Sequence, residues 1–133
     1  MKGCSNDFEL QDENSWKKLC TQWGTPSAKI RSMMKTYTQL SSLSGVLVYK
    51  GKGDTDAISY KFVSDSLCAA MVMMKSETTN IAALRKTFSH YEYLGEYNSN
   101  DLFIGEDQLV TIKQYSKDDI SYIAVGYVPF KLE

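Results

Sequence analysis

The sequence predicts an α+β fold, in which an antiparallel meander sheet carries two long helices on one face and a short N-terminal helix precedes them. Two segments have apolar residues at helical spacing, and each is followed by runs that alternate like half-buried strands. The chain has 133 residues, 43% hydrophobic and 23% charged, which suits one globular domain with its own core. We expect this single α+β domain to span residues 15–131.

The short N-terminal helix is predicted from Trp16, Leu19, Cys20 and Trp23, which recur at the spacing of one helical face. Gly24 is expected to end it, because glycine readily adopts the conformation found just after helices.

The first long helix is predicted to begin at Thr25, as its N-cap, and Pro26, at its first helical position. It is expected to run to about Leu40 and to end in a polar loop at residues 41–45. Four residues form its apolar stripe: Ile30, Met33, Met34 and Tyr37.

The second long helix is predicted to start at Thr78 or Thr79. Its stripe consists of Ile81, Leu84, Phe88 and Tyr91. Either stripe should be essential to the core, so an aspartate at Ile30 or Leu84 is expected to unfold the domain.

Seven strands are predicted between turn residues, at 46–50, 57–63, 67–75, 93–97, 101–104, 108–115 and 120–128. Residues 67–75 are apolar on both faces, which favours a central strand. The sheet face away from the long helices is expected to carry small residues, including Ala70, Ala124 and Gly126. The short helix or a second subunit would cover them.

The two helix–strand segments resemble each other at an offset of 54 residues. Ala28–Leu40 aligns with Ala82–Leu94, and Arg31 and Arg85 are identical at a polar position for which the pattern gives no structural reason. A duplicated helix–strand–strand–strand unit is therefore predicted, with repeats at 25–75 and 79–129. The alternative is two unrelated amphipathic helices that each precede a meander.

Few residues are candidates for catalysis or ligand binding, and no stretch carries a catalytic, cofactor or metal-binding signature. The one histidine, His90, lacks a nucleophile and an orienting carboxylate at a recognisable spacing. No cofactor and no metal site are predicted. A candidate binding surface is predicted from aromatic residues close together in the chain, because tyrosines make good contact anchors: Tyr91, Tyr93, Tyr97, Phe103 and Tyr115.

The N-terminus suggests a location. Gly3-Cys4-Ser5 matches the end of a bacterial lipobox, so Cys4 is the predicted lipidation site, although an incidental thiol is the alternative. Residues 1–14 would form a flexible tether, with Met1 an added start, and residues 132–133 would be a vector-derived tail. Whether Cys20 and Cys68 pair is left open.

The Gly3-Cys4-Ser5 start, the acidic tether, the Trp23-Gly24-x-Pro26 segment and the closing Tyr127-Val-Pro-Phe resemble small uncharacterised lipoproteins of Gram-negative anaerobes. The order of elements is also similar to that of envelope modules such as the β-lactamase-inhibitor-like fold. The resemblance implies an outer-membrane-anchored protein of the cell envelope, held through its N-terminal lipid.

We therefore expect a non-enzymatic envelope lipoprotein that binds a protein or glycan. The alternatives are a soluble, self-associating domain with a methionine- and tyrosine-rich face, or a carboxylate-dependent hydrolase. Nucleic acid is not expected as a partner, because the pI is about 5.8 and no basic run stands out.

Overall fold

The structure, a computed structural model, describes residues 19–52, 55–75 and 81–130, apart from the side chains of residues 81 and 83. This part of the chain forms one eight-stranded sheet and two seven-residue helices. The elements are α1 (Ser27–Met33), β1 (Gln39–Leu43), β2 (Val46–Lys50), β3 (Thr55–Val63), β4 (Ser66–Lys75), α2 (Ile81–Thr87), β5 (Glu92–Tyr97), β6 (Asn100–Gly105), β7 (Gln108–Lys117) and β8 (Ile120–Pro129).

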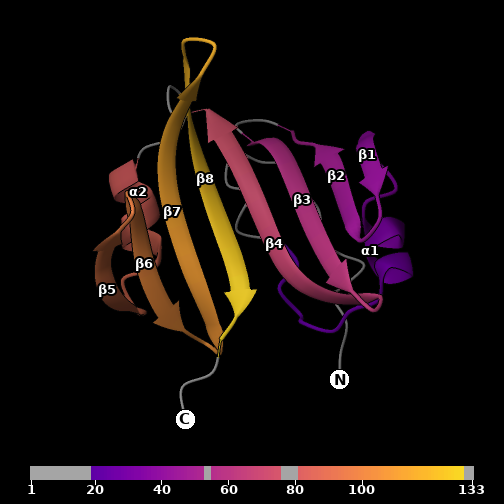
Figure 1. The fold of residues 1–133 in the computed structure, drawn as a ribbon, viewed down its shortest axis with the longest axis horizontal. Helices are drawn as coiled ribbons and strands as arrows, with labels where there is room; N and C mark the ends of the chain where they lie inside the picture. The colour runs from indigo at the N-terminus through magenta and orange to yellow at the C-terminus, as the bar shows by residue number, and fades with distance from the viewer. Residues whose placement is uncertain (1–18, 53–54, 76–80, 131–133) are drawn as a thin grey trace.

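The sheet consists of two four-stranded meanders that meet side by side. The strand order is β1-β2-β3-β4-β8-β7-β6-β5, and all neighbouring strands are antiparallel. β4 and β8 join the two halves, with Val72 opposite Val125. Figure 1 shows α1 and α2 at opposite flanks of the sheet and the β7–β8 hairpin extending beyond the other strand ends.

The predicted α+β class with two long helices is wrong, because the structure is mostly sheet and its helices are short. The seven predicted strands are present, each ending within two residues of its predicted bounds. β1 is an eighth strand, at residues predicted to form a helix end and a loop.

α1 ends at Met33 rather than at Leu40. The chain turns directly afterwards, where Tyr37 N–H donates to the Met34 carbonyl at 2.9 Å. Met34 and Tyr37 are nevertheless buried, at 1% and 8% exposed, because this turn brings them to the core as another helical turn would. The apolar stripe was therefore informative about burial but not about helix length.

β1 forms because the residues after this turn gain a strand partner. Ser44 and Gly45 make a two-residue connection to β2, with Gly45 at a φ of +77°, a conformation that favours glycine. Pairing with β2 satisfies backbone groups of a segment whose serines and glutamine give little strand signal.

α2 is likewise shorter than its stripe. It ends at Thr87, and Tyr91 N–H donates to the Phe88 carbonyl at 2.9 Å in the turn that follows. The two rings meet edge to face with centroids 5.4 Å apart, so both still pack in the core.

The predicted N-terminal helix is not observed in the part that the structure describes. Leu19 and Cys20 are buried but lie in irregular chain. Gly24 N–H donates to the Leu67 carbonyl, and Leu67 N–H donates to the Thr25 carbonyl, both at 2.9 Å, so this segment lies beside the start of β4. Backbone groups of this segment bond to β4 instead of to one another, and the spacing of residues in the sequence gives no indication of such long-range bonds.

One hydrophobic core lies between the helices and the sheet face that they cover, which we call the helix face. Ile30 and Leu84 contribute to it from the helices, at 0% and 2% exposed. Tyr60 is 0% exposed, its hydroxyl accepts the Cys20 N–H at 3.4 Å, and burial raises its pKa. Further strand residues in this core are Leu47, Tyr49, Ile58, Val72, Met74, Val110, Ile112, Ile123, Val125 and Tyr127.

The two halves have matching elements at the offset of 54 residues. α1 and α2 occupy equivalent positions, as do β4 and β8. Both outer strands also carry an irregularity at equivalent positions, between Gln39 and Ser41 and between Tyr93 and Gly95. A common origin of the halves by duplication stays a prediction.

The predictions for the chain ends lie outside the described residues. They are the lipidation of Cys4, the tether at residues 1–14 and the tail at 132–133. Within the described chain Cys68 has a free thiol, so it is not paired with Cys20.

Candidate binding surface

The five aromatic residues predicted as a binding surface do not come together. Tyr91 and Phe103 are buried in the core, at 8% and 5% exposed. Tyr93 lies on the helix face of β5, whereas Tyr97 and Tyr115 project from the opposite face of the sheet. These five residues are close in the sequence but do not form one surface, because successive side chains of a strand project from opposite faces of the sheet.

No described element covers the sheet face opposite the helices, which we call the open face. Its centre lies where the two halves meet, with Met71 of β4 opposite Gly126 of β8 and Thr111 of β7 on the far side of Gly126. The side chains here are apolar or small, and Met71 is 36% exposed. The apolar and small members of the open face include Val46, Val48, Ala57, Ser59, Ala69, Met71, Met73, Leu102, Leu109, Thr111, Ala124, Gly126 and Val128.

The open face is hollowed at its centre, with a cavity volume of about 270 Å³. Gly126 keeps this hollow open, because a Cβ at that position would lie 2.9 Å from Thr111 Oγ1. Ala124 and Gly126 are thus on the expected face, but Ala70 is 3% exposed on the helix face instead.

Lysines project from the same face as this hollow, and one of them, Lys61, lines it. Lys61 lies beside Ala69 across β3 and β4, and Lys113 lies beside Ala124 across β7 and β8. Lys50 and Lys75 project from the same face, on β2 and β4. The sequence contains no basic run, because these lysines come from four different strands. Their alternate positions along the strands could have indicated that they share one face of the sheet.

Tyrosines border one end of the open face. Tyr115 stacks on Tyr122 with ring centroids 5.5 Å apart, and its hydroxyl lies 2.8 Å from Met73 Sδ. Burial raises the pKa of Tyr115, so the phenol is neutral at physiological pH. The nearby carboxylate of Asp56 also raises the pKa of Tyr115, so this end of the face carries a negative charge as well. The open face therefore combines a soft apolar floor with lysines, one nearby carboxylate and tyrosine hydroxyl groups.

A second hollow, with a cavity volume of about 250 Å³, opens beside the end of α2. Gln108 Nε2 donates to Tyr91 Oη, and Tyr91 Oη donates to Glu106 Oε2, both at 2.8 Å; His90 Nε2 lies 3.5 Å from Glu106 Oε1. Burial, followed by the bond to Glu106, raises the pKa of Tyr91 to about 12. These groups bond to one another, and the hydroxyls of Thr21 and Thr87 also line the hollow, whereas its described lining contains neither serine nor cysteine.

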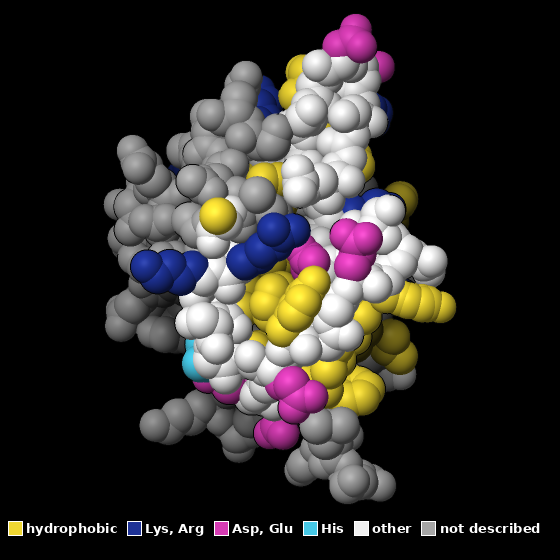
Figure 2. Space-filling view, turned by 90° about the vertical axis from the view of Figure 1, so that its left-hand side faces the viewer, with side chains coloured by type: hydrophobic (Ala, Val, Ile, Leu, Met, Phe, Trp, Pro, Cys, Tyr) yellow, Lys and Arg dark blue, Asp and Glu magenta, His cyan; other side chains and the backbone are white. Residues whose placement is uncertain are grey.

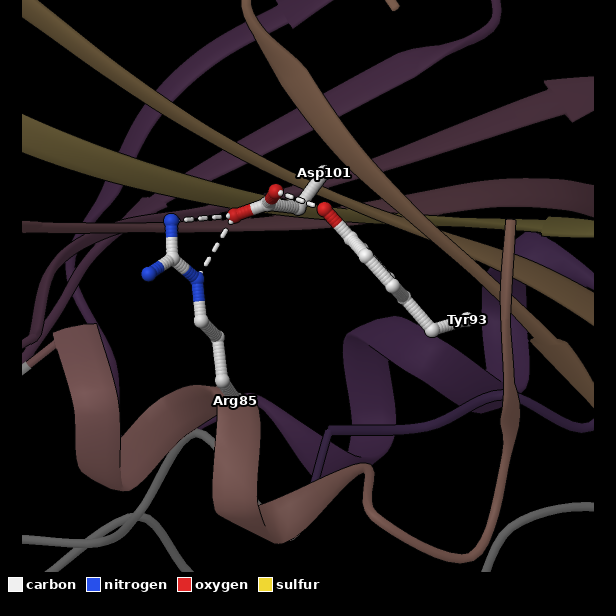
Figure 3. Close-up of polar contacts among 3 residues, drawn as sticks. All are labelled: Arg85, Tyr93 and Asp101. Atoms are coloured by element: carbon white, nitrogen blue, oxygen red, sulfur yellow. Dashed lines mark hydrogen bonds and ion pairs between the residues drawn. The ribbon is translucent and has the colours of Figure 1, made fainter. Parts of the chain in front are cut away.

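An ion pair joins α2 to the sheet (Figure 3). Arg85 Nε donates to Asp101 Oδ2 at 2.8 Å, and Tyr93 Oη donates to Asp101 Oδ1 at 2.9 Å. The bond to Asp101 raises the pKa of Tyr93. Figure 2 shows this flank, where exposed hydrophobic side chains lie among basic and acidic ones. Asp101 is buried and fully engaged, so this cluster anchors the helix and does not offer a free charged group.

The described residues include no group of three or more His, Cys, Asp or Glu side chains placed to hold a metal ion. No helix among them has the length and apolar character needed to cross a membrane. Comparison of the chain with protein-family models, with curated proteins and with solved structures gives no match.

Proposed function

We propose that the protein is a non-enzymatic binding module that holds an acidic, partly apolar segment of another protein on its open face. The observation that carries this proposal is an uncovered apolar hollow that Lys61 lines, on a sheet face to which three further strands contribute lysines. Apolar side chains of the partner would fill the hollow, and its carboxylates would meet the lysines.

A protein segment fits this face better than a glycan does. The centre is lined mainly by small or aliphatic residues such as Ala69, Met71 and Gly126, whereas the stacked rings of Tyr115 and Tyr122 lie toward one end of the face. Methionine adapts its shape to different apolar contacts. The expected location in the cell envelope, anchored by a lipid on Cys4, is a separate proposal that rests on the N-terminal motif alone.

Nuclear magnetic resonance titration with synthetic peptides tests the proposed function. One peptide alternates glutamate and leucine, a second alternates lysine and leucine, and a third contains glutamate and serine. We expect the glutamate–leucine peptide to bind most tightly, to shift the amide resonances of Met71, Thr111 and Gly126, and to weaken with added salt.

Two double variants with the same change of net charge, one on the open face and one away from it, test the role of the lysines. Lys61→Glu with Lys113→Glu should weaken this binding by about tenfold. Lys35→Glu with Lys86→Glu makes the same change of net charge away from the open face and should leave the affinity unchanged. Shifts confined to the helix face, or equal binding of all three peptides, would contradict the proposal. Binding of sulfated glycan with shifts at Tyr115 and Tyr122 alone would favour a glycan ligand instead.

A further inference from the structure

The five methionines of the described chain differ in how easily an oxidant reaches them. Met33, Met34 and Met74 are buried in the core, at 7%, 1% and 0% exposed. Met71 and Met73 of β4 project from the open face, where Met71 is 36% exposed and lines the hollow, and Met73 is half-buried. Oxidation of a methionine requires contact between its sulfur and the oxidant, so these two side chains are the candidates.

The strand pairing leaves Met71 uncovered. Its neighbours directly across β3 and β8 are Ser59 and Gly126. A hydroxymethyl group and a hydrogen atom are too small to cover a methionine side chain, so Met71 remains accessible from the hollow. Within the described chain, no side chain donates a hydrogen bond to the Met71 sulfur.

The sulfur of Met73, by contrast, has a hydrogen-bond donor. Tyr115 Oη donates to Met73 Sδ, and the two atoms are 2.8 Å apart. The ring of Tyr115 stacks on that of Tyr122, with centroids 5.5 Å apart, which holds the hydroxyl in place. A sulfur lone pair that accepts this bond is not available to attack an oxidant, so Met71 is the more reactive of the two.

We propose that Met71 is an oxidation site, at which a peroxide converts the thioether to a sulfoxide, and that this change regulates binding at the open face. A lone pair of the Met71 sulfur attacks one oxygen of hydrogen peroxide, and the O–O bond breaks. The sulfur keeps that oxygen, whose proton passes to the departing hydroxide, which leaves as water. The sulfur loses two electrons and the peroxide gains them. Methionine sulfoxide reductases reverse this oxidation, so the site can act repeatedly.

The consequence for binding rests on the proposed function. Met71 lies in the floor on which apolar side chains of the partner would pack. A sulfoxide replaces this soft apolar surface with a polar S–O group, which must lose its water when an apolar side chain covers it. Oxidation of Met71 should therefore weaken the binding of an acidic, partly apolar segment.

Treatment of the whole chain with hydrogen peroxide tests the site. A Cys68→Ser background removes the free thiol, which peroxide also attacks. Fragment-ion mass spectrometry follows each methionine separately, and Met71 should oxidise about tenfold faster than Met73 and Met74, because they are bonded or buried. In urea the three side chains should react at similar rates, which would show that the fold creates the difference.

Two phenylalanine variants test the protection of Met73. Tyr115→Phe removes the hydroxyl that bonds to the sulfur, so the oxidation rate of Met73 should rise toward that of Met71. Tyr122→Phe is the matched control, because it removes the neighbouring hydroxyl and keeps the bond to Met73. Equal oxidation of Met71 and Met73 in the parent chain, or a rate for Met73 that Tyr115→Phe does not change, would overturn the assignment.

Titration with the glutamate–leucine peptide before and after peroxide treatment tests the regulation. The oxidised protein should bind about tenfold more weakly. Met71→Leu has no sulfur at this position, so its own affinity should not change on the same treatment. Unchanged affinity after oxidation of Met71 would overturn the regulatory role. Failure of the untreated protein to bind would overturn the proposed function, whereas the oxidation rates test the site without any peptide, so the two failures are distinguishable.

Discussion

The guanidinium of Arg85 lies against the buried carboxylate of Asp101, with Nε 2.8 Å and Nη2 2.7 Å from the same oxygen. This contact explains one of the two arginines that the sequence pairs at an offset of 54 residues. Arg31, the other, donates to the exposed hydroxyl of Ser42 at 3.4 Å and has no buried carboxylate among its described contacts. In the first half Leu47 occupies the position of Asp101, so the equivalent arginines have different roles.

Arg85→Met should lower the free energy of unfolding by about 1–3 kcal/mol, because it leaves the Asp101 carboxylate buried without its charged partner. Adding Asp101→Leu, the residue at the equivalent position, should recover much of that loss. Urea unfolding measures both changes. Arg31→Met is the control and should change stability by less than about 0.5 kcal/mol. An equal loss in the single and double variants would contradict the ion pair's role.

Stability should fall at alkaline pH. Burial raises the pKa of Tyr60, Tyr91 and Tyr127 in the folded state, to about 12 for Tyr91, whereas the pKa of an unfolded tyrosine is about 10. Below pH 10 these phenols are neutral in both states, so their contribution is fully present. Above it the unfolded state loses protons first, so the free energy of unfolding falls as pH rises through 10 to 12.

Urea midpoints between pH 8 and pH 11.5 measure this effect, with tyrosinate absorbance followed in parallel. Tyr91→Phe should show a weaker dependence on pH, since one of the three raised groups is gone. Tyrosine absorbance that titrates fully near pH 10 while the chain remains folded would show that these phenols are not protected.

Gly126 should be coupled to Thr111. Gly126→Ala is expected to cost about 1 kcal/mol, because its Cβ would lie 2.9 Å from Thr111 Oγ1. Thr111→Ala removes that oxygen, so the double variant should lose less than the sum of the two single changes. Thermal unfolding of the four chains completes the cycle. Strict additivity would mean that the two residues do not touch as described.

The β7–β8 hairpin should tolerate a better turn sequence. Asp118 and Asp119 have φ values of +53° and +63°, the conformation of a type I′ turn, which asparagine followed by glycine prefers. Asp118→Asn with Asp119→Gly should raise the unfolding free energy by about 1 kcal/mol. Alanine at both positions is the control and should lower it. Stabilisation by the alanine pair would argue against this turn type.

The predicted lipid on Cys4 is decided by the intact mass of the protein from its native cell. Cys68 has a free thiol, whereas Cys20 is disulfide-bonded. A sulfur in a disulfide cannot carry a thioether-linked lipid, so lipidation requires that Cys4 is not the partner of Cys20. A diacylglyceryl mass on the N-terminal peptide supports the anchor, and a disulfide between Cys4 and Cys20 without lipid excludes it.

Particular elements show how far the sequence could lead. Apolar runs, alternating or continuous, between turn residues located the seven strands from β2 to β8, because burial of one or both strand faces imposes a local residue pattern. They missed β1, whose serines carry no such pattern. The apolar stripes identified Ile30, Met34 and Leu84 as core residues, yet they overstated both helices, since a turn can bury the same side chains.

The sequence did not predict which side chains lie together on the surface. Tyr91 and Tyr93 looked equivalent in the chain, but one is buried beside Gln108 and the other bonds to Asp101 on the flank. The lysines of the open face were not recognised, because Lys61 and Lys113 belong to strands far apart in the sequence.

The sequence by itself determined seven of the eight described strands and much of the core, because these depend on local periodicity and hydrophobicity. Only the tertiary structure decided that β4 pairs with β8, and that pairing sets Met71 opposite Gly126. It creates the hollow of the open face, leaves β1 and β5 as edges, and brings lysines from four strands to one face of the sheet. Long-range pairing leaves no local pattern in a single chain, which is why this face appears only in the folded protein.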